Sequence, residues 1–308
     1  MTSSGKWALS LFVALHAAFA AMADEVSYIR VDVPKLLASR LAMEALSAWP
    51  GGAPVLERFQ SYMNTLGVDP AKVAPVVTII PDFDAADRTV ALLRFPPGAQ
   101  EILAAAAEKT VFFSVSSGTS GKIFCLTSRD DKSPGAKSLR FVAVFVSPRL
   151  AWAGEESAVE EWRSRTAGGP GQFFPDLLEE REEAVIFSLP VAGRDDVRRL
   201  FGGVEKIDGK LLVKANSLEL AVRASGGDIQ RFSSVVQGFY ILGVNLLFDR
   251  DTEIKKTLYG KPVFKVENNI FTAHIELERP LIERMVTLLR AKELPAPAGT
   301  SPEDEVTE

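Results

Sequence analysis

The chain has 308 residues, of which 47% are hydrophobic and 24% are charged. These values are close to those of globular domains and exclude a largely disordered chain. The net charge is −5 and no run of five lysines or arginines occurs, which argues against nucleic acid or an anionic membrane surface as the partner. The only cysteine, Cys125, excludes an intramolecular disulfide, and its apolar neighbours predict a buried, inert thiol.

The first 23 residues are typical of a secretory signal peptide. Lys6 precedes an apolar run over residues 7–20, and the small residues Ala21 and Ala23 form a cleavage site before Asp24. The run is too short to favour a spanning helix, and no cysteine follows it that could carry a lipid. Removing Lys6 with the leader leaves 34 basic and 40 acidic residues, a net charge of −6. We therefore expect export to the periplasm or the medium after cleavage near Ala23, without a stable membrane anchor.

Residues 24–166 have the pattern of an N-terminal α+β domain. Apolar spacing switches between the helical and the strand period, and Gly67 is placed to end a helix. Residues 117–121, rich in glycine and hydroxyl side chains, suit a five-residue hairpin loop. The expected helices cover 34–49, 54–66, 99–108 and 155–165, and the expected strands cover 28–32, 76–80, 89–95, 110–116, 122–128, 139–146 and 150–153.

A linker is expected over residues 167–183. Its first five residues contain three glycines and a proline, which continue neither a helix nor a central strand. Phe173 and Phe174 follow directly. They are candidates for an exposed contact with a partner, although packing into the seam between the two halves explains them better.

Residues 184–294 have the pattern of a C-terminal α+β domain. The pair Asn268-Asn269 tolerates positive φ and predicts a tight hairpin with Val266 opposite Phe271. The expected strands cover 184–189, 218–223, 263–267 and 270–278. The expected helices are a short one after residue 193, a long apolar one over 228–248 with positions 229, 232, 236, 239, 243 and 247 on its inner side, and a last one from residue 280. Residues 295–308 are an acidic tail with nothing to bury.

Catalytic motifs are missing from the sequence. After removal of the leader one histidine remains, His274, which the hairpin places on a polar strand face, so triads and histidine-ligated metals lack residues. Asp82, Asp84 and Asp87 share a loop that could hold calcium, but solvation of a loop explains them better. Asp249 and Asp251 are explained by helix capping. We expect no metal and no cofactor.

A recurring pattern covers mainly the first half of the chain. Residues 66–73, read LGVDPAKV, lead into the strands at 76–80 and 90–95, and residues 144–146 and 150–155 follow as a strand pair and a helix start. This order resembles large, uncharacterised families of secreted bacterial proteins. The resemblance implies export and an α+β fold. It transfers no activity and no site residue.

The sequence as a whole predicts an α+β protein with antiparallel sheets, helices packed on them, and two sequential halves that suggest a duplication. It favours a non-catalytic binding or protein-interaction module of the cell envelope over an enzyme. The partner would be an unknown protein or an apolar small molecule. Two alternatives stay open: a carrier of a lipid-like or other apolar ligand in a pocket, and a hydrolase that uses two carboxylates across a cleft.

Overall fold

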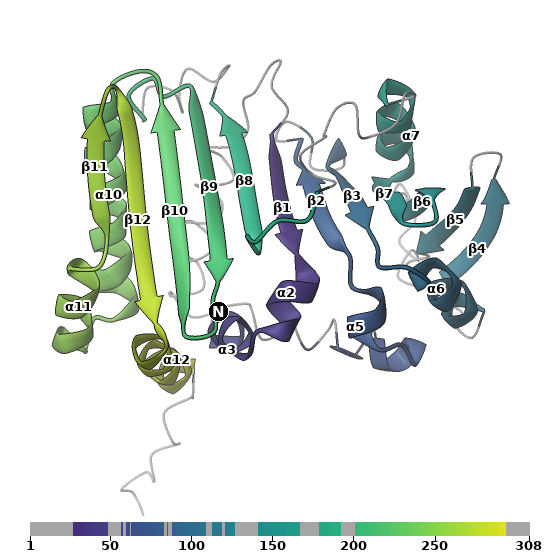
Figure 1. Cartoon of the computed structure of the whole chain (residues 1–308), viewed down its shortest axis with the longest axis horizontal. Helices are drawn as coiled ribbons and strands as arrows, with labels where there is room; N and C mark the ends of the chain where they lie inside the picture. The colour runs from purple at the N-terminus through teal and green to yellow at the C-terminus, as the bar shows by residue number, and fades with distance from the viewer. Residues whose placement is uncertain are drawn as a thin grey trace, which may run out of the picture.

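The computed structural model describes residues 27–48, 57, 60–61, 63–82, 85, 88–108, 113–118, 121–126, 141–166, 179–191 and 201–293. The leader predicted over 1–23, Phe173, Phe174 and the tail predicted over 295–308 lie outside these residues. The strands form one sheet of twelve, and every neighbouring pair is antiparallel (Figure 1). The α+β class predicted from the sequence is thereby confirmed.

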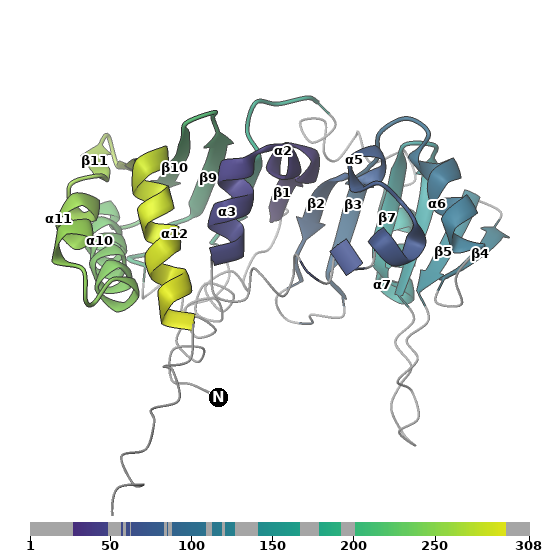
Figure 2. The ribbon, with the colours of Figure 1, turned by 90° about the horizontal axis from the view of Figure 1, so that it is seen from below.

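The sheet is arched and twisted along its length, with β11 at one edge and β4 at the other (Figure 2). Its order from edge to edge is β11-β12-β10-β9-β8-β1-β2-β3-β7-β6-β5-β4. The strands in chain order are β1 (Tyr28–Asp32), β2 (Val76–Ile80), β3 (Val90–Arg94), β4 (Phe113–Gly118), β5 (Gly121–Leu126), β6 (Phe141–Ser147), β7 (Leu150–Glu155), β8 (Val185–Pro190), β9 (Lys206–Val213), β10 (Ser217–Ser225), β11 (Val263–Glu267) and β12 (Ile270–Glu278).

Helices cover the two faces of the sheet at different places. Neighbouring residues of one strand show the alternation: Ala151 packs in the cluster that includes α6, whereas Trp152 packs in the cluster that includes α7. We call these two sides the α10 face, which also carries α6, and the α7 face. The described helices are α2 (Val33–Ala38), α3 (Arg40–Ala48), α5 (Pro70–Val73), α6 (Ala99–Ala107), α7 (Glu156–Arg165), α10 (Ile229–Leu247), α11 (Thr252–Tyr259) and α12 (Arg279–Glu293).

The two halves repeat one topology. Each starts at the centre of the sheet and runs outward through three adjacent strands, β1-β2-β3 and β8-β9-β10. A helix follows on the same face, α6 or α10, and the chain returns by a hairpin whose second strand, β7 or β12, pairs with the third strand. The hairpin β4-β5 and the helix α11 are additions to one half each. The shared order gives the duplication suggested by the sequence a structural counterpart.

The sequence predicted a separate sheet for each half, but the two halves contribute to one sheet. The two central strands β1 and β8 pair, with Ile29 opposite Phe187. Helix α3 of the first half packs against α12 of the second, where Leu41 shares a buried cluster with Ile282. The Nη2 atom of Arg290 also donates to Ser47 Oγ at 2.8 Å. Both halves therefore complete a common core.

Several local predictions can be compared with the described residues. The hairpin register is confirmed: Val266 lies opposite Phe271, and Asn268 and Asn269 have φ values of 52° and 58°. The helix expected over 34–49 is wrong, because Ser39 is extended and its Oγ accepts from Ala42 N at 3.2 Å, which ends α2 and caps α3. The loop expected over 117–121 is also too long, since the paired strands reach Gly118 and Gly121.

Candidate functional site

Helix α10 is the longest described helix, and two glycines and a capping aspartate define where it starts. Gly226 and Gly227 have φ values of 85° and 63°, which turn the chain out of β10. The carboxylate of Asp228 then accepts from Arg231 N at 3.0 Å and caps the helix. This turn lays the first half of α10 on the sheet, where Ile229 and Phe232 pack with Phe271.

The inner side of α10 differs from the predicted one after its second turn. Position 239 was expected inside, but Phe239 is 42% exposed and Tyr240 is half-buried. The Tyr240 hydroxyl donates to the carbonyl of Leu258 at 2.8 Å, and Val244 packs with Ile254. After residue 236, the buried side of α10 therefore continues with residues 240 and 244, because α11 packs against them.

The outer side of α10 is apolar as well. A surface helix normally turns polar residues outward, yet four large apolar residues of α10 are about half exposed. The exposed fractions are 42% for Phe239, 50% for Ile241, 52% for Leu242 and 54% for Leu246. These four residues are called the α10 surface below. Three of them, Phe239, Leu242 and Leu246, recur at helical spacing on one side.

The α10 surface lies at one end of the sheet, away from the β4-β5 hairpin (Figure 2). Its border is polar. The hydroxyl of Tyr259, itself 41% exposed, donates to Asn245 Oδ1 at 2.6 Å. Within α10 the only charged residue is Arg231, two turns before Phe239. An apolar centre with a polar rim is the usual composition of a protein contact.

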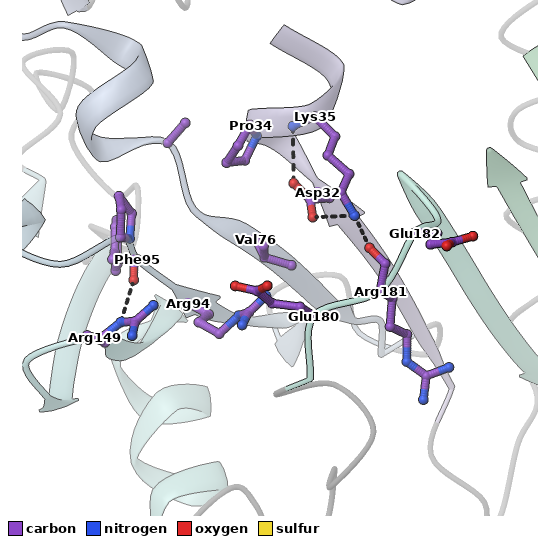
Figure 3. A pocket seen from close by; sticks show the side chains of 12 residues that line it. Asp32, Pro34, Lys35, Val76, Arg94, Phe95, Arg149, Glu180, Arg181 and Glu182 are labelled. Carbon is purple, nitrogen blue, oxygen red and sulfur yellow. Dashed lines mark hydrogen bonds and ion pairs between the residues drawn. The ribbon is translucent and has the colours of Figure 1, made fainter. Parts of the chain in front are cut away.

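A second feature is an open cavity of about 610 Å³ on the α7 face (Figure 3). Asp32, Val76 and Arg94 are register neighbours across β1, β2 and β3, so they form one row of its wall. Residues 180–182 cross in front of β1, and the turn between β6 and β7 adds Arg149. The remaining lining residues are Pro34, Lys35, Ala74, Phe95 and Pro96.

Several polar groups of this cavity hold its own wall together. One carboxylate oxygen of Asp32 accepts from Lys35 N at 3.1 Å and caps α2, and the other lies 3.5 Å from Lys35 Nζ. The Lys35 ammonium also donates to the carbonyl of Arg181. Arg149 Nε donates to the carbonyl of Phe95 at 3.3 Å. These contacts place cationic groups on opposite sides of the opening.

Arg30 lies behind the cavity, on the same side of β1 as Asp32. It is 1% exposed, and its Nη2 atom donates to the carbonyl of Glu179 at 3.2 Å. Its Nε atom is buried without a hydrogen-bond partner in the described part of the chain. Burial, and next the nearby charge of Arg94, lower the pKa of Arg30. The interior beside the cavity is therefore rich in positive charge.

The candidate residues of the sequence are placed elsewhere. His274 Nε2 lies 2.8 Å from Glu219 Oε1, and this contact, after that of Lys214, lowers the pKa of Glu219. Asp251 caps α11, as the sequence predicted, by accepting from Ile254 N at 2.8 Å. Asp82 accepts from Ala85 N at 3.0 Å within its loop, whereas Asp84 and Asp87 lie outside the described residues. Of Cys125, the structure describes only its place in β5.

Two further properties concern the described residues alone. They contain no group of three histidine, cysteine or acidic side chains that could hold a metal ion. None of their helices combines the length and the apolar character that crossing a bilayer requires.

Comparison with known proteins gives similarity in overall course only. No protein-family model matches the sequence, and no curated protein matches it. A solved structure of TP0453, in crystal form III, superposes with a TM-score of 0.47 at 8% identity over 89% of this chain and 97% of that chain. Crystal form IV of the same protein gives 0.45 at 9% identity, over 88% of this chain and 95% of that chain. No site residue or ligand follows from a likeness of this size.

Proposed function

We propose that this chain is an exported, non-catalytic interaction module of the cell envelope, and that it contacts a partner protein through the α10 surface. The observation that supports this most directly is the exposure of Phe239, Ile241, Leu242 and Leu246 on one helix. Exposed apolar groups gathered in this way are typical of contact sites. A protein partner fits better than a membrane, because α10 carries one cation while interfacial helices use many, and because the chain is acidic.

The two alternatives receive less support from the described residues. A carrier of an apolar ligand needs an enclosed apolar cavity, whereas the cavity on the α7 face is open and bordered by charged residues. A carboxylate-based hydrolase needs two acids committed to a substrate. Asp32, the buried acid of that cavity, instead caps α2 and pairs with Lys35.

Photo-crosslinking in an exporting host tests the proposal. A photoreactive residue replaces Leu242 in one variant and Thr272, an exposed residue of β12 on the α7 face, in a matched control. We expect one discrete protein adduct from position 242, identified by mass spectrometry, and its loss when Leu246→Asp is added. Equal adducts from both positions, or adducts with lipid alone, would contradict a protein contact at this surface.

A further inference from the structure

The cavity on the α7 face has the dimensions and the mixed lining of a small-molecule site. Its volume of about 610 Å³ lies within the roughly 300–1,000 Å³ common for ligand pockets. It is built from five separate parts of the chain, which meet only in the fold: the end of β1, the α5-β2 junction, the end of β3, the β6-β7 turn and residues 180–182. The site is separate from the α10 surface, and this inference does not rest on the proposed function.

The charge of the lining favours an anion. Lys35, Arg94, Arg149 and Arg181 stand against three acids, Asp32, Glu180 and Glu182. Asp32 is already engaged by Lys35, and Glu180 and Glu182 belong to an exposed segment, where water weakens the effect of their charges without removing it. Buried Arg30 adds a further positive charge behind the wall. Asp32 and Glu183 offset part of the charge of Arg30, and a bound anion would offset more of the positive charge.

The guanidinium groups of Arg149 and Arg94 line the opening and could bind an anion there. Arg149 is exposed and uses Nε to bind the carbonyl of Phe95, which orients its planar group while leaving the two terminal nitrogens for other acceptors. Arg94 and Glu180 both line the cavity, and their side chains are labelled in Figure 3. Planar guanidinium groups bind carboxylates with two parallel hydrogen bonds.

The rest of the lining is apolar. Pro34, Val76, Phe95 and Pro96 lie between the charged groups. Such a surface suits the hydrocarbon part of a molecule whose charged end reaches an arginine. A fully hydrated inorganic anion would leave it uncovered.

We propose that this cavity binds a small amphiphilic carboxylate, whose anionic end pairs with Arg149 and Arg94 and whose apolar body lies against Phe95, Val76 and the two prolines. Glu180 then acts as an internal competitor for Arg94.

Calorimetric titration of residues 24–308 with sodium hexanoate tests this directly. We expect saturable binding of hexanoate, and clearly weaker binding of hexan-1-ol, hexylammonium and inorganic phosphate. Arg149→Gln should weaken hexanoate binding by about 10-fold or more, because a hydrogen bond to a charged group is lost. Glu180→Gln should strengthen it. Arg250→Gln, a charge removal at a side chain that is 92% exposed and outside this site, should leave it unchanged.

Other results would overturn the proposal. Absence of saturable hexanoate binding, equal binding of hexan-1-ol, or preference for hexylammonium would each exclude a carboxylate site. Equal binding of inorganic phosphate would leave a plain anion site without selection for an apolar body. Arg149 is exposed, so its variants should fold. The hexanoate affinity of Arg149→Lys, which keeps the charge but not the planar fork, should lie between those of wild type and Arg149→Gln. A failure here leaves the crosslinking result at position 242 unaffected.

Discussion

The ring of Phe187 on β8 lies over Gly209 of the neighbouring strand β9. A Cβ atom on Gly209 would stand 2.0 Å from Cζ of that ring and 2.3 Å from Cε1. Gly209→Ala should therefore force the ring aside and lower the free energy of unfolding by about 1–3 kcal/mol. Urea denaturation measures the change.

A matched glycine gives the control for that prediction. Gly238 lies within α10, and an added Cβ would meet nothing within 4 Å. Gly238→Ala should raise the free energy of unfolding by about 0.5–1 kcal/mol, because alanine loses less backbone entropy in a helix. If Gly209→Ala were as stable as wild type or more stable, the close contact of Phe187 with Gly209 would be wrong.

Two phenylalanines of α10 should behave differently. Phe232 is 2% exposed and packs edge-on against Phe271, with ring centroids 5.2 Å apart, whereas Phe239 belongs to the exposed α10 surface. Phe232→Ala should cost about 3–5 kcal/mol of unfolding free energy. Phe239→Ala should change it by at most about 0.5 kcal/mol. A large loss for Phe239→Ala would show that this side chain is buried and would remove it from the proposed contact surface.

Tyr240 should ionise only at high pH. Burial raises its pKa to about 12, and the charge of Tyr259 acts in the same direction. Because the folded-state value lies above the ordinary value of 10.0, the associated stability is complete below pH 10 and is lost as the pH rises towards 12. Rapid alkaline titration of tyrosinate absorbance should show a component near 12 that Tyr240→Phe removes. An unchanged curve would contradict its burial.

Asp251 gives a prediction at the acidic end. The backbone N–H of Ile254, and then the guanidinium of Arg284 at 3.0 Å, lower the pKa of this carboxyl. Its stabilisation is therefore present above the ordinary value of 3.8 and is lost as the pH falls through the lowered value. Asp251→Asn keeps a capping oxygen but no charge, so its melting temperature should fall less steeply than that of wild type below about pH 4. If the melting temperatures of the two proteins fell in parallel with pH, the charge of Asp251 would add nothing to stability.

Local signals in the sequence were sufficient where one short segment determines the structure. Asn268-Asn269 fixes a two-residue turn, and with it the pairing of β11 and β12. Strand β9 was missed, because Asp208 and Gly209 interrupt its apolar pattern. The glycine is explained only by Phe187, a residue of another strand, whose ring occupies the space that a side chain would need.

The candidate sites depend on contacts between residues that are far apart in the sequence. Asp32, Arg94, Arg149 and residues 180–182 come together only through the sheet and its crossing segment. Likewise, Phe239 has the same spacing as an inner residue of α10, and it is exposed because α11 engages Tyr240 and Val244 instead. A periodic pattern identifies an apolar helix but does not show which of two apolar sides a later element will cover.

The central pairing of β1 with β8 has a consequence for how the chain folds. Ile29 and Phe187 face each other across the middle of the sheet although they are 158 positions apart, so β1 keeps one open edge until β8 has been synthesised. Long-range pairing of this kind slows folding, and an open edge invites other strands. Deletions that remove β8 should therefore yield a first half that aggregates, and folding of the intact chain should benefit from a chaperone that shields β1 in the interval.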